Sequence, residues 1–384
     1  MSQVVITGVG AVSCLGDSAA QLWEGLLKAD ARPSPAPEDC ALDPRPSVYQ
    51  VRGAAQERTE RAGRLHGRTS GMACHAVGEA LADAGLGPEQ LADAGLTVGT
   101  TLGDIDLAES GAADDAPATA SFQVASAVAG TYGLGGPNQT LSTACSAGVY
   151  AVSSAAELIS SGQADVVIAC GADGYSRVAL ASLERFGLLD RVLCRPFDAD
   201  RQGMVTGDGA AAVVLESAEH ARRRGATPYA VLEGDGWSCD GHHPTAPEPG
   251  GEQLSRAVAG ALAGASGPLG AVVLHRAGIA VNDVVESDVI AAALGDRVDR
   301  TPAFGIKAVI GHTAGAAGAF GCVAAALMLR HRTVPPNAHV DTLDPECSLE
   351  VPLDGPVPLT EPRVMVSATG FGGNNAALVL GAAS

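Results

Sequence analysis

Aromatic residues, positive charge and paired cysteines are all scarce in this sequence. Aromatics make up 3% of its 384 residues while hydrophobic residues make up 46%, so we expect a core of Ala, Val, Leu and Gly that pack closely rather than around large rings. Lys and Arg number 24 against 43 Asp and Glu, for a formal net charge of -19. Because nucleic acids and anionic membranes attract clusters of Lys and Arg, the charge argues against a nucleic-acid or membrane partner.

The nine cysteines form no CxxC pair and show no metal-ligand spacing. Their odd number, scattered along the chain, favours reduced thiols in a cytoplasmic protein and predicts no metal site. The first residues, MSQVVITGVGAV, lack the basic region and cleavage site of a secretory signal. We also expect no apolar stretch of membrane-spanning length.

Short runs rich in Val and Ile alternate with Ala-rich segments along the whole chain. The runs QVVITGVGAV, ADVVIACGADG and RVMVSATGFGG are predicted strands, and SRAVAGALAGA and AGAAGAFGCVAAALMLR are predicted helices. This alternation predicts an α/β fold. The length fits either two fused α/β halves or one large fold with a continuous core.

A polar, locally basic segment separates two of the strand-like runs. This segment, SAEHARRRGATP at 217–228, is the best candidate for a boundary. We place the boundary near residue 222, which divides the chain into residues 1–222 and 223–384. Two other segments, 30–48 and 109–119, are rich in Pro, Ala and Asp and are predicted to be surface loops.

One cysteine stands at a predicted strand-to-helix turn. The segment NQTLSTACSAGVYAVSSAAELISSG runs from a strand-like start, through small residues around Cys145, into a helix with apolar residues at helical spacing. The unpaired N–H groups and the dipole at a helix N-terminus favour a thiolate, so we expect the pKa of Cys145 to be lowered and its sulfur to be nucleophilic. The alternative is a small buried hydrophobe, the usual role of a free cysteine.

Two histidines and a glycine-rich turn strengthen the case for catalysis. His275 follows the apolar run AVVL, and His312 lies in KAVIGHTAGAAG. A single histidine is usually structural, but a cysteine and histidines that are distant in sequence can converge in a fold, as nucleophilic catalysis requires. The segment GFGGNN at 370–375 is either a tight turn or a source of backbone N–H groups for an oxyanion hole.

Taken together, four segments resemble the β-ketoacyl-acyl carrier protein synthases, a family of the thiolase superfamily. They are TACSAG around Cys145, CRPFDADRQGMVTGDGAAAVVLE at 194–216, KAVIGHTAGAAG at 307–318, and GFGGNN near the end. Their order and spacing match the family over nearly the whole chain. The resemblance implies a five-layered αβαβα thiolase-like fold of two similar halves, the first with the nucleophilic cysteine and the second with a histidine pair.

The same resemblance implies a role for each residue of the site. Cys145 would carry the acyl group, while His275 and His312 would donate hydrogen bonds to the thioester carbonyl of the extender as its carboxylate departs. Lys307 would orient His312. The N–H groups of Cys145 and Phe371 would hold the acyl oxyanion, and Phe371 would also gate the acyl pocket.

The resemblance further implies partners and the absence of a cofactor. Substrates would arrive on the phosphopantetheine arm of an acyl carrier protein, and neither a metal nor a redox cofactor would be needed. The chain would form a homodimer, or a heterodimer with a homologous ketosynthase-like or chain-length-factor-like chain.

The sequence departs from the family after its first catalytic histidine. The family usually has a Gly-Thr-Gly-Thr-like run there, whose hydroxyls bind the phosphopantetheine arm, whereas Arg276, Ala277, Gly278 and Ile279 follow His275 here. Both hydroxyls are lost, which indicates altered carrier presentation or a different substrate unless the positions have simply drifted. Arg276 is a candidate contact to a phosphate or carboxylate at the pantetheine entrance.

Further differences concern the surroundings of the site. Gly321 stands where many relatives carry a glutamate linked to the lysine and a bound ion, so Lys307 is expected to lack that partner. Asp240, His243 and Thr245 match a stretch that approaches the pantetheine entrance in relatives, or else form an ordinary polar loop. The loops at 103–121 and 184–194 look shorter than in fatty-acid-elongating relatives, which leaves acyl chain length open.

Three functions fit these observations. The first is a β-ketoacyl synthase that performs decarboxylative Claisen condensation in a specialised type II polyketide or polyene pathway. The second is a cysteine-dependent acyltransferase that uses this fold without chain extension, which the altered pantetheine contacts favour. The third is a noncatalytic ketosynthase-like partner. Retention of Cys145, His275, Lys307 and His312 argues against the third, and the intact histidines favour the first.

Overall fold

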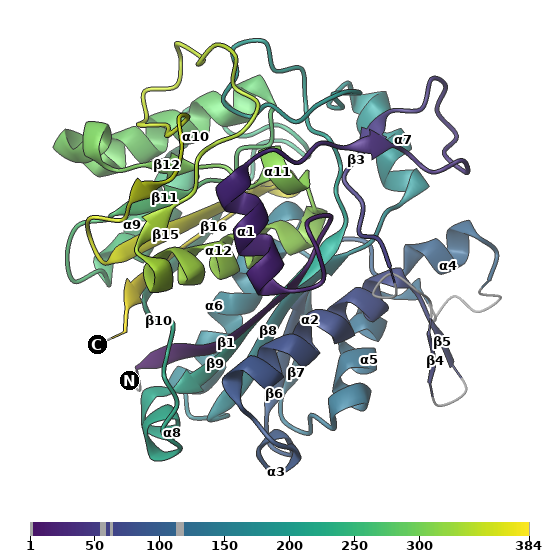
Figure 1. Cartoon of the computed structure of the whole chain (residues 1–384), viewed down its shortest axis with the longest axis vertical. Coiled ribbons are helices and arrows are strands. Elements are labelled where there is room, and N and C mark those ends of the chain that lie inside the picture. Colours follow the sequence, from purple (N-terminus) through teal and green to yellow (C-terminus); the bar gives the residue numbers. More distant parts are fainter. Residues whose placement is uncertain (1–2, 54–58, 62–63, 113–118, 384) are drawn as a thin grey trace.

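The strands of this chain pair into one large mixed sheet (Figure 1). The computed structural model describes residues 3–53, 59–61, 64–112 and 119–383. Within these residues the main sheet has ten strands in the order β12-β11-β15-β16-β10-β1-β9-β8-β6-β7. Their bounds are β1 Val4–Val12, β6 Gly95–Gly99, β7 Asn138–Leu141, β8 Val166–Asp173, β9 Gly209–Ser217, β10 Ala230–Cys239, β11 Ala271–Val273, β12 Ala303–Phe304, β15 Arg363–Gly370 and β16 Asn374–Ala382.

The sheet consists of two halves with the same topology. In the first, β7 and β8 flank β6 in parallel, and β8, β9 and β1 continue antiparallel. In the second, β12 and β15 flank β11 in parallel, and β15, β16 and β10 continue antiparallel. Antiparallel pairing of β1 with β10 joins the halves. Two similar halves were predicted and are confirmed, whereas a boundary near residue 222 stays a prediction.

Helices cover both faces of this sheet and fill the space between its halves (Figure 1). Helices α2 (Arg68–Ala84) and α5 (Phe122–Tyr132) pack on the outer face of the first half, and α9 (Glu252–Ala263) and α10 (Ala280–Leu294) on that of the second. Helices α6 (Ala147–Ser160) and α12 (Ala317–His331) form the central layer. The expected αβαβα arrangement is therefore confirmed.

Each strand serves two layers because its side chains alternate between faces. Along β9, Val213 and Leu215 pack with the central helices, whereas Ala212 and Val214 pack with α2 and α5. Such strands are buried on both sides, which explains why their sequences are continuous apolar runs rather than alternating ones.

The two central helices cross at a pair of glycines. A Cβ atom added to Gly148 in α6 would lie 2.4 Å from the backbone nitrogen of Ala319, and one added to Gly318 in α12 would lie 2.6 Å from that of Val149. Both distances are shorter than any real carbon contact, so only glycine allows the backbones to approach this closely. Close packing of small residues agrees with the scarcity of aromatics in the sequence.

One helical segment corrects an expectation. The segment Ala314–His331 is long and apolar enough to cross a membrane by length and composition, so the prediction that no stretch reaches that length is wrong. However, 83% of this segment is buried inside the protein. Its position as the central helix α12 between two halves of a sheet accounts for its apolar composition.

The remaining elements lie at the periphery and around the site. The short helices are α1 Ala19–Lys28, α3 Pro88–Leu91, α4 Ile105–Glu109, α7 Arg177–Phe186, α8 Ala218–Arg223 and α11 Lys307–Ile310. Three two-stranded ribbons pair β2 Ser34–Pro35 with β3 Ser47–Val48, β4 Thr59–Arg61 with β5 Arg64–His66, and β13 Thr333–Val334 with β14 Val357–Pro358. The predicted loops at 103–121 and 109–119 both include residues 113–118, which lie outside the described residues.

Candidate active site

Cys145 sits in a tight turn between β7 and α6. The turn is a single 3-10 segment, Ala144–Ser146, and Ala144 has a φ of 50°, in the left-handed region that residues other than glycine rarely occupy. Such strain persists only where the surrounding structure imposes it, and it is common at active sites. The predicted strand-to-helix turn is thus confirmed. The second half repeats it, with Ala314 at φ 47° before α12 and Gly315 in the place of Cys145.

Burial controls the ionisation of the Cys145 thiol. Removal from water raises its pKa to about 11, although the Lys307 ammonium and the backbone N–H groups of Phe371 and Cys145 act in the opposite direction. The nearby Asp173 carboxyl raises the pKa further. The prediction of a lowered pKa is therefore wrong, because loss of hydration outweighs stabilisation at the helix N-terminus. The resting residue is a neutral thiol.

The two predicted histidines lie together, and His312 lines the same cavity as Cys145. The ring centroids of His275 and His312 are 5.5 Å apart, with the rings nearly perpendicular at 82°. Burial, with the charge of Lys307 next to it, holds the pKa of both imidazoles well below the usual value, so both are neutral near pH 7. His312 Nδ1 accepts the Ala314 N–H at 3.2 Å, which leaves the proton on Nε2 available for donation.

Lys307 connects this pair to the protein interior. Its ammonium donates a hydrogen bond to the backbone carbonyl of His275, whereas its interaction with the His312 ring is electrostatic. Burial lowers the pKa of Lys307, and Glu286 is the first of the negative groups that oppose this shift. Gly321 offers the lysine no carboxylate, but the buried Glu286 lies nearby.

A cavity of about 250 Å³ opens beside Cys145 and is lined mainly by apolar side chains. Its lining includes Cys145, His312 and Phe371, together with Val178, Leu183 and Phe186 of α7. The GFGGNN segment packs against the cysteine turn, because a Cβ on Gly370 would lie 3.2 Å from the Cys145 nitrogen. The cavity has the size and polarity of a site for an acyl chain.

Two carboxylates of α10 belong to this site and were missed in the sequence. Glu286 accepts the backbone N–H groups of His275 at 2.7 Å and Arg276 at 2.9 Å. Asp283 accepts those of Ala277 and Gly278, each at 3.1 Å. A visible signal existed, namely two acids three residues apart in VNDVVES just after His275, where one turn of helix places them on one face.

Asp173 is a third acid that sequence reasoning missed. Its carboxylate accepts the Thr100 hydroxyl at 2.8 Å, the Leu102 N–H at 3.0 Å and the Gly315 N–H at 2.7 Å. It also accepts the N–H of Thr101. Asp173 thereby ties the end of β8 to the loop after β6 and to the turn before α12, which brings the two halves together at the cysteine.

Arg276 does not lie where the sequence suggested. Its side chain is fully buried, with its guanidinium 4.6 Å from the centroid of the Phe197 ring and 2.9 Å from the sulfur of Cys347. The prediction that it contacts a phosphate or carboxylate at the pantetheine entrance is therefore wrong.

The other predicted entrance residues form a loop against the glycine-rich turn. Asp240 accepts the side-chain N–H of Asn375 at 2.6 Å and donates its own N–H to the Gly373 carbonyl at 2.9 Å. His243 is exposed, and its Nδ1 accepts the N–H of Thr245 at 3.1 Å. Their binding role stays a prediction. Among the described residues no group of three or more His, Cys, Asp or Glu side chains is placed to hold a metal ion.

Comparison with known proteins gives matches over the whole chain. Residues 1–221 match the profile of the beta-ketoacyl synthase N-terminal domain, and residues 229–341 match that of its C-terminal domain. A 3-oxoacyl-[acyl-carrier-protein] synthase 2 of Rhizobium meliloti (strain 1021) is 32% identical over 99% of both chains.

Two solved structures are also similar over their full lengths. The ishigamide ketosynthase/chain length factor superposes with a TM-score of 0.89 at 32% identity, covering 100% of both chains. A type II polyketide acyl carrier protein in complex with its ketosynthase, bound to the hexaketide, gives a TM-score of 0.88 at 25% identity, again with 100% of both chains covered.

Proposed function

The chain belongs to the beta-ketoacyl synthase family, and on that premise we propose that it catalyses decarboxylative Claisen condensation of a Cys145-bound acyl group with a malonyl thioester. One observation carries the proposal. Cys145, in a strained turn, and the neutral His312 imidazole line one apolar cavity, and the neutral His275 imidazole lies 5.5 Å from that of His312. That set can hold an acyl thioester and stabilise an enolate next to it.

The first step loads the enzyme. The Cys145 sulfur attacks the carbonyl carbon of an acyl thioester, and its proton passes to the departing thiolate of the carrier, so that one thioester replaces another. Because the thiol is neutral at rest, this proton must leave as the new bond forms. The backbone N–H groups of Cys145 and Phe371 face the sulfur and would hold the oxyanion of the tetrahedral intermediate.

The second step extends the chain. The bond to the carboxylate of the malonyl thioester breaks, carbon dioxide leaves, and the electron pair stays as an enolate whose oxygen accepts hydrogen bonds from the histidines. His312 offers its Nε2 proton for this purpose. The enolate carbon then attacks the carbonyl carbon of the Cys145 thioester, a carbon–carbon bond forms as the carbon–sulfur bond breaks, and the released thiolate takes a proton from water. A neutral donor suits this step, since it stabilises developing negative charge without pairing tightly with the substrate carboxylate.

Partners follow from the same proposal. We propose that substrates arrive on the phosphopantetheine arm of an acyl carrier protein, that its entrance lies near Asp240, His243 and Thr245, and that no metal takes part. The chain would act in the cytoplasm as a homodimer or with a homologous chain, in a specialised type II polyketide pathway. The similarity to the ishigamide ketosynthase/chain length factor supports this assignment.

Two measurements test the assignment of Cys145. The Cys145→Ala variant should gain no acyl mass after incubation with an acyl-carrier substrate, whereas the matched Cys239→Ala variant, which removes an exposed cysteine, should load as the unmodified protein does. Intact-protein mass spectrometry reports both. Acyl loading of Cys145→Ala to the wild-type extent would overturn the assignment.

The reaction class is tested by decarboxylation. Release of carbon dioxide from malonyl thioester should fall strongly in His275→Ala and in His312→Ala, while acyl loading of Cys145 survives better. The cysteine-dependent acyltransferase remains the second candidate, because Ala277 and Ile279 lack the hydroxyls that bind the carrier arm. It predicts no carbon dioxide release from the wild-type protein and acyl transfer from Cys145 to an amine or alcohol.

A further inference from the structure

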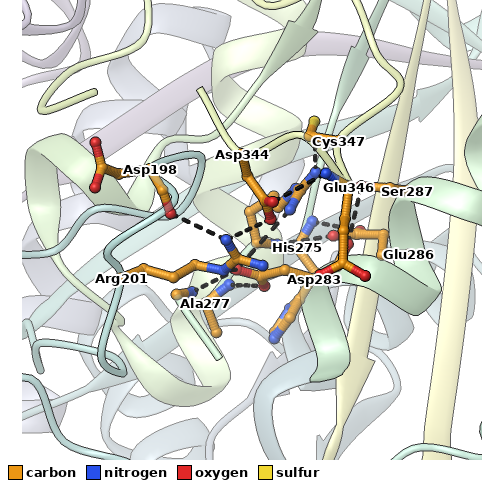
Figure 2. A network of polar contacts seen from close by, with 12 residues as sticks. Asp198, Arg201, His275, Ala277, Asp283, Glu286, Ser287, Asp344, Glu346 and Cys347 are labelled. Carbon is orange, nitrogen blue, oxygen red and sulfur yellow. Dashed lines mark hydrogen bonds and ion pairs between the residues drawn. The ribbon is translucent and has the colours of Figure 1, made fainter. Parts of the chain in front are cut away.

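A cluster of buried charges lies directly behind His275 (Figure 2). It contains three carboxylates and three cations, all nearly inaccessible to water: Asp283, Glu286, Asp344, Arg201, Arg276 and Lys307. Formal charges therefore balance within the cluster. Because isolated buried charges are strongly unfavourable, removal of any one member leaves an opposite charge uncompensated.

The carboxylates of this cluster hold the loop that carries His275. Glu286 and Asp283 together accept four consecutive backbone N–H groups, from residue 275 to residue 278, at 2.7 to 3.1 Å. Figure 2 shows both carboxylates reaching the loop from one side. The conformation of this loop, and with it the position of the His275 ring, thus depends on two carboxyl groups that are buried away from water.

Arg276 belongs both to the loop that carries His275 and to the cluster of buried charges. Its backbone has a φ of 28°, which is unfavourable for a residue with a side chain. Its guanidinium turns inward, donates to the Ser287 hydroxyl and the Cys347 sulfur, and lies 3.9 Å from Asp283. This position therefore combines backbone strain with the burial of a cation.

We propose that Arg276 is a positioning residue for His275: its buried guanidinium lies 3.9 Å from the Asp283 carboxyl group and fixes the loop from inside the protein. The inference rests on the proposed role of His275 in decarboxylation. Arg276 does not touch substrate, since its side chain is fully buried. It acts through the carboxylate that binds the two N–H groups next to it.

Electrostatics supports this role. Burial raises the pKa of Asp283 to about 7, while Arg276 and then Arg201 lower it. The charged and titratable groups that interact with Asp283 are Arg276 in its loop, Arg201 at 3.2 Å, Glu286 on the same helix, Lys307 on α11 and the Cys194 thiol. Without Arg276 the pKa of Asp283 rises further, and a protonated Asp283 accepts fewer hydrogen bonds from the loop.

The test compares carbon dioxide release from malonyl thioester across pH in wild type, Arg276→Met and Arg276→Lys. Methionine roughly keeps the length of the side chain but removes its charge. The decarboxylation rate of Arg276→Met should fall about 100-fold at neutral pH, which is the loss expected when a catalytic group is misplaced by about 1 Å. The acid limb of the remaining activity should move to higher pH by about one unit. Lys keeps the charge and should restore most of the rate.

Two controls separate positioning from simple loss of stability. Acyl loading of Cys145 should change less than about threefold in Arg276→Met, because the N–H groups of the loop bind Glu286 and Asp283 and not the Cys145 turn. Arg224→Met removes a partly buried arginine that pairs with the buried Glu216 away from the site, and it should leave the pH profile unchanged. If Arg276→Met decarboxylates at the wild-type rate and the acid limb of its pH profile stays at the wild-type pH, the proposal is overturned.

A second variant covers the case in which Arg276→Met does not fold. Asp283→Asn imitates the protonated carboxyl at every pH, so it should decarboxylate slowly and without an acid limb. A wild-type rate in Asp283→Asn overturns the positioning role. If instead His275→Ala releases carbon dioxide as fast as wild type, the proposed function itself fails, and the inference that rests on it fails with it.

Discussion

The ionisation of Cys145 gives the sharpest quantitative prediction. With a pKa of about 11 rather than the ordinary 9.0, the fraction of thiolate at about pH 7.5 is about 3 in 10,000 instead of about 3 in 100. Alkylation by iodoacetamide proceeds through the thiolate. Its rate at Cys145 should therefore be about 100-fold lower than at an unperturbed thiol of equal access.

Peptide mass spectrometry can follow this rate from roughly pH 6 to pH 9.5. The rate at Cys145 should rise about tenfold for each pH unit, with no plateau within this range. The Lys307→Met variant should be slower still, because the lysine ammonium lowers the pKa of the thiol, while alkylation of the exposed Cys239 provides an internal control. A plateau below about pH 9 would refute the reasoning and restore the prediction that the helix N-terminus dominates.

Three further outcomes follow from the packing and the buried carboxylates. Gly148→Ala should reduce the free energy of unfolding by about 3 kcal/mol in urea denaturation, since its Cβ would overlap the backbone of α12; Gly130→Ala in α5, where a Cβ meets open space, should be neutral or stabilising. Glu286→Gln should lower carbon dioxide release about tenfold or more, because the uncharged amide weakens its hydrogen bonds to the His275 loop; a wild-type rate would contradict this. Asp173→Asn should cost about 2 kcal/mol of stability, measured in the same denaturation assay, since an amide nitrogen then faces the N–H groups that the carboxylate accepts.

Much of the fold could be predicted from the sequence because its signals are local. Apolar runs of strand length between Ala-rich segments gave the element order, and the β1, β8, β9 and β15 strands lie where such runs occur. The internal repeat is visible as well. TACSAG and TAGAAG precede α6 and α12, and both turns contain an alanine with positive φ. The expectation of two similar halves came from the family resemblance and not from this repeat.

The prediction that distant residues meet in one site rested on the family resemblance rather than on any sequence pattern. Cys145, His275 and His312 come from separate turns, and no spacing rule places them together. The family resemblance predicted that these residues share one site, but it did not predict the interactions that stabilise them. It assigned Lys307 to His312, whereas the hydrogen bond of this lysine goes to the carbonyl of His275. It also left the lysine without a carboxylate, although Glu286 on α10 provides one.

Two of the three wrong predictions, those on Cys145 and Arg276, share a physical cause. A helix N-terminus is visible in the sequence around Cys145, but the loss of hydration that outweighs it is a sum over neighbours from both halves of the fold. Likewise, an arginine after a catalytic histidine suggests an exposed cation, because arginine is rarely buried without a partner. The partners of Arg276, which include Phe197, Asp283, Ser287 and Cys347, are spread over 150 residues of sequence. Local chemistry therefore identifies which groups a site contains, and only the three-dimensional environment decides whether each of them is charged.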